Sequence, residues 1–214
     1  MRVIAVPVKS LGHGKSRLAT VLSPLERGAL TLAMFEDVLD ATLGLEGWET
    51  WVVSADESVL EIAVGRRART IVEQGSSLRA AIEQIEEEAA ERAAEALAIV
   101  PADLPLVTGA ALTAAVHTLG PVVLAPSADE RGTNLLLRRP PNAIPSRFGA
   151  DSYRRHLEAA AERDLPIAVI ERGELAFDLD DPGDILTMLR SRRPGRTLEV
   201  CRELGLEERV GART

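Results

Sequence analysis

The chain has 214 residues, 46% hydrophobic and 3% aromatic, with a formal net charge of −8, so aliphatic side chains must fill one sizeable core. The acidic balance argues against a nucleic-acid-binding face as the main function but leaves room for a local positive pocket. The single cysteine, Cys201, excludes an intrachain disulfide, no apolar run approaches the roughly 20 residues of a membrane span, and the start fits a strand better than a signal peptide. We therefore expect a cytoplasmic protein without a membrane or nucleic-acid partner.

Short apolar runs alternate with helical patterns along the chain, which predicts an α/β fold with a mostly parallel sheet. The clearest helix start is at Ser23, where Pro24 follows the cap and Glu26 lies three positions on. One domain is expected over 1–190, followed by a charged tail (191–214) with a weak helix. The expected strands are 2–8, 50–54, 70–72, 96–100, 121–125, 134–137 and 167–170. The expected helices are 24–43, 58–67, 78–95, 108–119 and 152–163, one from 182 onward, and a weak one at 198–204.

The stretch ALAIVPADLPL (96–106) is a continuously apolar run that ends in two prolines. Such a run predicts a strand buried on both faces, and the prolines end it. Asp103 would then lie just past the carboxyl end of a central strand, where open α/β sheets bind ligands. Asp is also common beside Pro in turns, so Asp103 taken alone fits a turn cap equally well.

The loop after the first strand contains both lysines of the chain, Lys9 and Lys15, together with glycine, Ser16 and Arg17. A strand, a Gly/Lys loop and a helix supply backbone N–H groups and cations for a polyphosphate. Position 9 is not glycine, so the full phosphate-loop pattern fails. An ordinary flexible loop is the alternative.

Asp178 and Asp180 lie two apart in a short extended segment, so both carboxylates point the same way. Two or three carboxylates suit magnesium, which binds a few of them together with substrate phosphates. Together with Asp103, three carboxylates could converge on one magnesium ion. Asp181 would point away and cap the next helix. A negatively charged turn is the alternative for the pair.

The stretch RFGADS (147–152) opens a predicted helix and offers Arg147, a glycine and Ser152 to an anion. A second polar turn, Gly132-Thr133-Asn134, precedes a strand. Each also fits an ordinary turn or cap. The histidines, including His156, show no metal or catalytic spacing, so we expect structural or surface roles for them.

These pieces, in this order, resemble the 2-phospholactate guanylyltransferase family, which makes the activated phospho-carboxylate used to build the deazaflavin coenzyme F-420. PADLPL alone is common among nucleotidyltransferases, whereas RGTN, RFG.DS and FD.D.P together are specific. The matching stretches are PVKSLGHGKSRLATVLSPLERGALTLAM (7–34), PADLPL (101–106), APSADERGTNLLL (125–137), RFGADSYRRHLEAA (147–160) and LAFDLDDPGD (175–184).

The resemblance implies a three-layer, Rossmann-like nucleotidyltransferase fold of the GT-A, molybdenum-cofactor guanylyltransferase kind, together with GTP and magnesium. It also implies nucleotide contacts from the loop, namely Lys9, Lys15, Ser16 and Arg17. Arg79 stands where the family often has asparagine, so the family's nucleotide contact at this position is not carried over to this chain. The implied catalytic and metal ligands are Asp103, Asp178 and Asp180, and the implied acceptor contacts are Thr133, Gly149 and Ser152.

The predicted reaction is the transfer of GMP from GTP to the phosphate of phosphoenolpyruvate or 2-phospho-L-lactate, with release of pyrophosphate. Both reactants are anions, so catalysis needs charge neutralisation and alignment more than a protein nucleophile. We expect hand-over of the product to a downstream transferase, and a homodimer is left open. Alternatives are a sugar-phosphate or molybdopterin nucleotidyltransferase of the same fold, or a nucleotide-binding module without turnover. A pure binder has little use for three converging aspartates.

Overall fold

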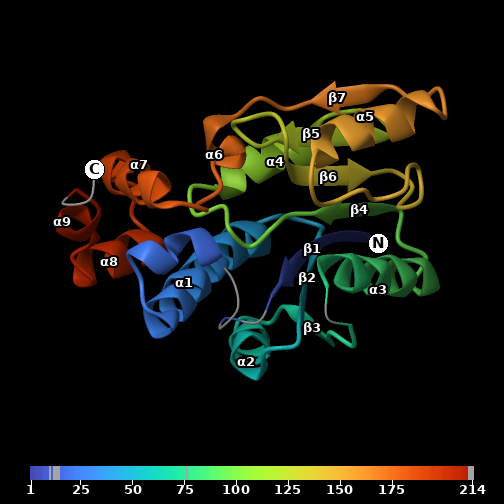
Figure 1. Ribbon diagram of the computed structural model, residues 1–214. Helices are drawn as coiled ribbons and strands as arrows, with labels where there is room; N and C mark the ends of the chain where they lie inside the picture. The colour runs from blue at the N-terminus through green and yellow to red at the C-terminus, as the bar shows by residue number, and fades with distance from the viewer. Residues whose placement is uncertain (10, 12–14, 76, 212–214) are drawn as a thin grey trace.

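The computed structural model describes residues 1–9, 11, 15–75 and 77–211, and within them one seven-stranded sheet carries helices on both faces (Figure 1). This confirms the predicted α/β class. The strands are β1 (Arg2–Val8), β2 (Glu49–Ser54), β3 (Arg69–Val72), β4 (Ala96–Ile99), β5 (Val122–Pro126), β6 (Thr133–Arg138) and β7 (Ile167–Val169). The helices are η1 (3-10, Ser16–Thr20), α1 (Pro24–Leu43), α2 (Glu57–Gly65), α3 (Leu78–Glu91), α4 (Gly109–His117), α5 (Ser152–Ala161), α6 (Gly173–Ala176), α7 (Pro182–Ser191), α8 (Arg196–Glu203) and α9 (Leu206–Gly211).

The strand order β3-β2-β1-β4-β6-β5-β7 positions the candidate site. β6 runs antiparallel to β4 and β5, and the other neighbouring strands are parallel. From β1 the chain builds the sheet first toward β2 and then, in the other direction, toward β4. Ligands of open α/β sheets bind beyond the carboxyl ends of the strands at such a reversal. The loops after β1 and β4 therefore flank the expected binding site.

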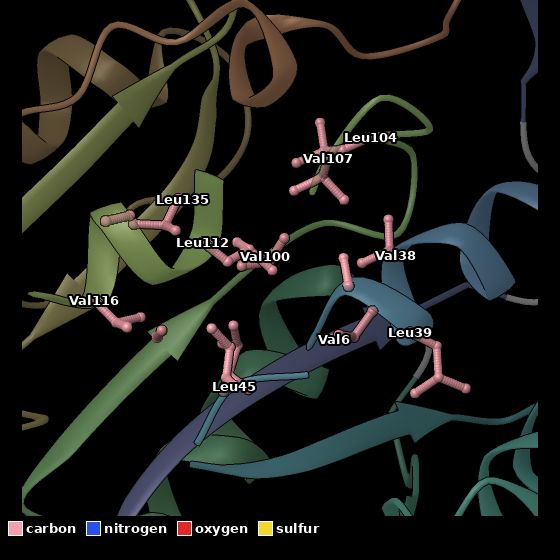
Figure 2. Packing of buried hydrophobic residues seen from close by; sticks show 14 of the residues in the cluster. Val6, Val38, Leu39, Leu45, Val100, Leu104, Val107, Leu112, Val116 and Leu135 are labelled. Atoms are coloured by element: carbon pink, nitrogen blue, oxygen red, sulfur yellow. The ribbon is translucent and has the colours of Figure 1, made fainter. Parts of the chain in front are cut away.

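Helices on both faces make three layers, because successive side chains of each strand point to opposite sides. In β1, Val6 belongs to the core shared with α1, α2 and α4, whereas Ala5 belongs to the core covered by α3. Figure 2 shows the first of these cores, where Val6 and Val100 share a cluster with Val38 of α1 and Leu112 of α4. α5 covers β5 and β6 on the same face as α3. The buried cores hold β1 and β4 in place, and their following loops extend from this rigid base.

The C-terminal residues form α8 and α9, which pack against α1 and α7 (Figure 1). Arg209 of α9 donates to the backbone oxygen of Val21 at 2.6 Å and to the Glu26 carboxylate at 2.6 Å. The sequence predicts a charged tail with one weak helix here, because many charges interrupt the apolar pattern. The structure instead describes two helices with buried apolar faces. The buried residues of this cluster include Leu18, Leu30, Met34, Met188, Leu198, Cys201, Leu206 and Val210.

Helix boundaries follow the local signals closely at the start of α1, where Ser23 and Glu26 form the predicted capping box. The end of α3 differs: the Ala- and Glu-rich pattern predicts a helix to 95, but the helix ends at Glu91. Ala93 adopts a φ of 50° there and turns the chain into β4. The short α6 is not predicted by the sequence. No described helix is both long and apolar enough to cross a membrane.

Candidate active site

A pocket of about 220 Å³ opens at the reversal of strand order, between the carboxyl ends of β1 and β4. Lys9 and Lys15 from the loop after β1 line one part of it, and Asp103 from the loop after β4 lines another. Leu78 at the start of α3 and Asp180 before α7 also line it. Segments far apart in the sequence thus place two cations and two carboxylates around one cavity.

Lys15 lies at the centre of this pocket as a bridge between two of the predicted aspartates. Its Nζ donates to Asp103 Oδ2 at 2.8 Å and to Asp180 Oδ1 at 2.6 Å, and its side chain is only 9% exposed. Burial lowers the pKa of this ammonium, but the two carboxylates outweigh that effect and raise it, so Lys15 stays charged. A φ of 56° at Lys15, in the left-handed region, directs the chain into η1.

Asp178 is the third predicted carboxylate and faces the same charges. Burial, followed by the nearby charges of Asp103 and Asp180, raises the pKa of Asp178 to about 6. Asn134 of β6 donates from Nδ2 to Asp178 Oδ1 at 3.5 Å and to the backbone oxygens of Leu175 and Ala176 at 2.9 and 3.1 Å. An ionised carboxylate in such surroundings is unfavourable unless a cation accompanies it.

We tested whether these residues fit magnesium from the donors they present. Asp103 and Asp180 already place oxygens within 2.8 Å of a single positive charge, the Lys15 ammonium, and their hard oxygens suit Mg²⁺. Within the described part of the chain, no three His, Cys, Asp or Glu side chains are gathered closely enough to hold a metal. The pair binds the Lys15 ammonium, and its oxygens suit Mg²⁺ chemically; magnesium at Asp103, Asp178 and Asp180 stays a prediction.

Asp181, the next residue, has the separate role that the sequence predicts for it. Its Oδ1 accepts from the backbone N–H groups of Gly183 at 2.8 Å and Asp184 at 3.2 Å, and it caps α7. Asp184 returns the contact, because its Oδ2 accepts from the N–H groups of Asp180 and Asp181, both at 2.8 Å. This capping box fixes the backbone that presents the Asp180 side chain to the pocket.

A second polar cluster joins the start of β6 to the start of α5. Thr133 Oγ1 accepts from Ser152 Oγ at 3.1 Å and lies 3.0 Å from His156 Nδ1. The other ring nitrogen of His156, Nε2, accepts from the backbone N–H of Arg147 at 2.8 Å. The edge of the imidazole packs against the Phe148 ring. Two of the predicted acceptor residues, Thr133 and Ser152, are therefore in direct contact.

The start of α5 is predicted to offer unpaired backbone N–H groups to an anion, but two of these groups already have partners. Ser152 donates its backbone N–H to Gly149 at 3.1 Å, and Tyr153 donates its own to Arg131 at 3.2 Å. The Asp151 cap lies in the left-handed region at φ 52° and makes no side-chain cap. Gly149 has a φ of 112°, which explains glycine at this position. Thr133 and Ser152 are both buried, so their two hydroxyls lie just beneath the loop that leads into α5.

The structure brings the predicted residues into two neighbouring groups joined by Asn134, the residue after Thr133. Ser16 and Arg17 are exposed on η1, outside the residues that line the pocket. Residues 10 and 12–14 of the predicted phosphate loop lie outside the described residues. The nucleotide, metal and acceptor roles of all these residues stay predictions.

Sequence reasoning missed two members of the site. Asn134 belongs to the RGTN motif, but only the fold shows that its side chain reaches Asp178. The spacing of His156 predicts a structural or surface role, and its full burial fits the structural one; its bonds to Thr133 and Arg147 are what the sequence does not indicate. The one available signal was its position in the RFGADSYRRH stretch, one helical turn after Ser152 on the same face of α5.

The neutral state of His156 gives a pH-dependent stability that can be measured. Burial, followed by the charges of Arg138, Arg155 and Arg147, lowers the pKa of His156 to about 3 from 6.5. The unfolded chain then binds a proton between pH 6.5 and 3 that the folded chain does not, so stability falls as pH drops below 6.5. Between pH 7.5 and 5, the free energy of unfolding, measured with urea, should fall by about 2 kcal/mol more in the wild type than in His156→Asn. Equal losses in both proteins would contradict the neutral imidazole.

Comparison with known proteins now decides the family. The family model described as guanylyl transferase CofC like matches residues 1–211. The chain belongs to this family. Phosphoenolpyruvate guanylyltransferase of Rubrobacter xylanophilus is 43% identical over 86% of this chain and 92% of the relative. The 3-phospho-D-glycerate guanylyltransferase of Phenylobacterium zucineum is 38% identical over 89% of this chain and 90% of the relative. The 2-phospho-L-lactate guanylyltransferase of Methanothermobacter thermautotrophicus is 36% identical over 93% of this chain and 89% of the relative.

The fold of this CofC-like protein matches solved structures as well. A protein from Desulfovibrio desulfuricans G20 described as a nucleotide-diphospho-sugar transferase superposes with a TM-score of 0.79 at 18% identity, over 99% of this chain and 98% of that one. At this identity the match concerns the fold alone, and it confirms the α/β architecture that the sequence resemblance implies.

Proposed function

We propose that this CofC-like protein transfers GMP from GTP to the phosphate of a small phospho-carboxylate and releases pyrophosphate. The observation that carries the proposal is the lysine–aspartate cluster at the reversal of strand order, in a chain whose relatives are named guanylyltransferases. The polar cluster of Thr133 and Ser152 is the proposed acceptor site, tied to the first cluster through Asn134.

In this reaction a phosphate oxygen of the acceptor attacks the α-phosphorus of GTP, and the bond from that phosphorus to the β-phosphate bridging oxygen breaks. Lys9 and Lys15 both line the pocket, and in the proposed complex they would supply positive charge to the nucleotide phosphates. Magnesium, held by Asp103 and Asp180 with Asp178 as the proposed third ligand, would neutralise charge on the two reacting phosphates. No protein nucleophile is needed.

The acceptor is the finer part of the proposal. Relatives are named for phosphoenolpyruvate, 3-phospho-D-glycerate and 2-phospho-L-lactate, which share a phosphate and a nearby carboxylate. We propose phosphoenolpyruvate, because the most similar of these three relatives is named for it. The product, a phosphoanhydride that joins the acceptor phosphate to GMP, is activated and suits hand-over to a downstream transferase.

The decisive experiment is pyrophosphate release from GTP and magnesium with each of the three acceptors, coupled to the mass of the product. Phosphoenolpyruvate should give the highest kcat/KM and a product heavier than the acceptor by one GMP unit less water. Release with a sugar phosphate alone would point to another nucleotidyltransferase of this fold. GTP binding without release for any acceptor would indicate a nucleotide-binding module.

The loop lysine should matter for the nucleotide more than for the acceptor. Lys15→Ala removes a buried cation from the pocket and leaves Asp103 and Asp180 to repel the phosphates, so GTP affinity should fall about ten- to a hundredfold. Arg17→Ala, on the exposed η1, should weaken GTP binding less. Calorimetry with GTP and magnesium measures both. Unchanged GTP affinity in both variants would show that the loop after β1 does not bind the nucleotide and only connects β1 to η1.

A further inference from the structure

The hydrogen bonds of His156 determine which ring nitrogen carries its proton. A backbone N–H only donates, so Nε2 must accept the bond from Arg147 and carries no hydrogen. In a neutral imidazole the proton is then on Nδ1, which lies 3.0 Å from Thr133 Oγ1. Nδ1 therefore donates to the threonine hydroxyl.

The same reasoning extends to Thr133. Its oxygen has two lone pairs and one proton. Ser152 Oγ donates to it at 3.1 Å and His156 Nδ1 donates to it at 3.0 Å, which uses both lone pairs. The threonine proton is then left for a third group, and the hydroxyl can only donate to it.

We propose that His156 is a positioning residue that holds the Thr133 hydroxyl as a hydrogen-bond donor toward the anionic acceptor. This inference rests on the proposed function, because it takes Thr133 as an acceptor contact. A hydroxyl that can only donate favours a fully ionised phosphate or carboxylate and disfavours a protonated or neutral group. His156 thus adds selectivity for charge without touching the acceptor.

The surroundings keep this arrangement constant over the working pH range. His156 is fully buried, and the positive charges that face it are Arg147 from the preceding loop, Arg138 of β6 and Arg155 of α5 itself. Among the residues that the structure describes, the charges that shift the pKa of its ring are all those of arginines, with no carboxylate among them. The imidazole therefore stays neutral near pH 7, as a donor at Nδ1 and an acceptor at Nε2.

Imidazole nitrogen NMR tests the tautomer directly and does not depend on activity. In ¹⁵N-histidine-labelled wild-type protein, the His156 signals, assigned by their loss in His156→Gln, should show a protonated Nδ1 and an unprotonated Nε2. They should not change between pH 5 and 8. A proton on Nε2, or titration within that range, would overturn the proposal.

Kinetics with matched variants test the effect on the acceptor. His156→Asn can place an amide N–H near the Nδ1 position and keep the donation to Thr133, whereas His156→Gln extends toward the Nε2 position and loses it. We expect His156→Gln to raise the acceptor KM about three- to tenfold, the value of one neutral hydrogen bond, with little change in kcat or in the KM for GTP. His156→Asn should stay within about twofold of wild type.

The control is His117→Gln, an exposed histidine at the end of α4, which should behave as wild type. The positioning role would be overturned if His156→Asn and His156→Gln had equal acceptor KM values. It would also be overturned if His156→Gln raised the KM for GTP as much as the KM for the acceptor. Wild-type protein that transfers GMP to none of the acceptors would refute the proposed function, and with it the acceptor role of Thr133. The NMR experiment would still decide the tautomer in that case.

Discussion

Asp178→Asn is expected to lose guanylyl transfer at least a hundredfold and yet to unfold at a higher denaturant concentration than wild type. Burial and two neighbouring carboxylates raise the pKa of Asp178 to about 6, so its ionised form destabilises the fold above pH 6. The folded chain binds a proton between pH 3.8 and 6 that the unfolded chain does not, and this penalty is fully present at pH 7.5. Asn removes it, which should stabilise the protein by on the order of 1–2 kcal/mol without magnesium.

Asp103→Asn and Asp180→Asn should lose activity to a similar extent but without the gain in stability. Each of these carboxylates accepts a short bond from the buried Lys15 ammonium, so removing its charge costs stability instead. The matched control is Asp181→Asn, because Asn caps a helix about as well as Asp and should leave turnover nearly unchanged.

Turnover at saturating magnesium, manganese affinity and urea unfolding together separate these effects. The metal assignment predicts weaker manganese binding in the Asp103, Asp178 and Asp180 variants and unchanged binding in Asp181→Asn. If any two of the three variants turned over within a few-fold of wild type, the metal assignment would be wrong.

The parts of the fold that depend on local chemistry follow from the sequence. The predicted capping box at Ser23 and the predicted cap at Asp181 define where α1 and α7 begin, since each satisfies the same backbone donors in any context. The apolar run before Pro101 indicates a central strand, because only burial on both faces tolerates it. Placing Asp103 beyond that strand then follows from the general behaviour of parallel sheets.

The parts that depend on tertiary contacts do not follow in the same way. The sequence predicts that Lys15 binds phosphates. Its two aspartate partners lie 88 and 165 residues further along the chain, so no local pattern can reveal these contacts. His156 has no catalytic spacing, since its partners come from a different strand and a loop. The last two helices are short and highly charged. The few apolar residues that pack them against the rest of the protein do not form a recognisable helical pattern in the sequence.

Gly149→Val is expected to abolish use of the acceptor nearly completely while GTP affinity stays close to wild type. Gly149 has a φ of 112°, a conformation that a β-branched residue adopts only with strain, so the loop before α5 must change shape. That loop leads directly into Ser152 and the Thr133 contact. A Cβ at Gly149 meets no atom within 4 Å, so the effect should be confined to the loop.

Gly205→Val is the matched control, because Gly205 also has a positive φ, 59°, and open space around its Cβ but lies between α8 and α9. It should cost some stability and leave both KM values unchanged. Ser152→Ala, which removes a donor to Thr133, should raise the acceptor KM about tenfold. Steady-state kinetics with each substrate varied in turn measure these effects. If Ser152→Ala and Gly149→Val impaired GTP use and spared the acceptor, the two substrate sites would have to be exchanged: the nucleotide phosphates would bind at the start of α5, and the acceptor beside Lys15.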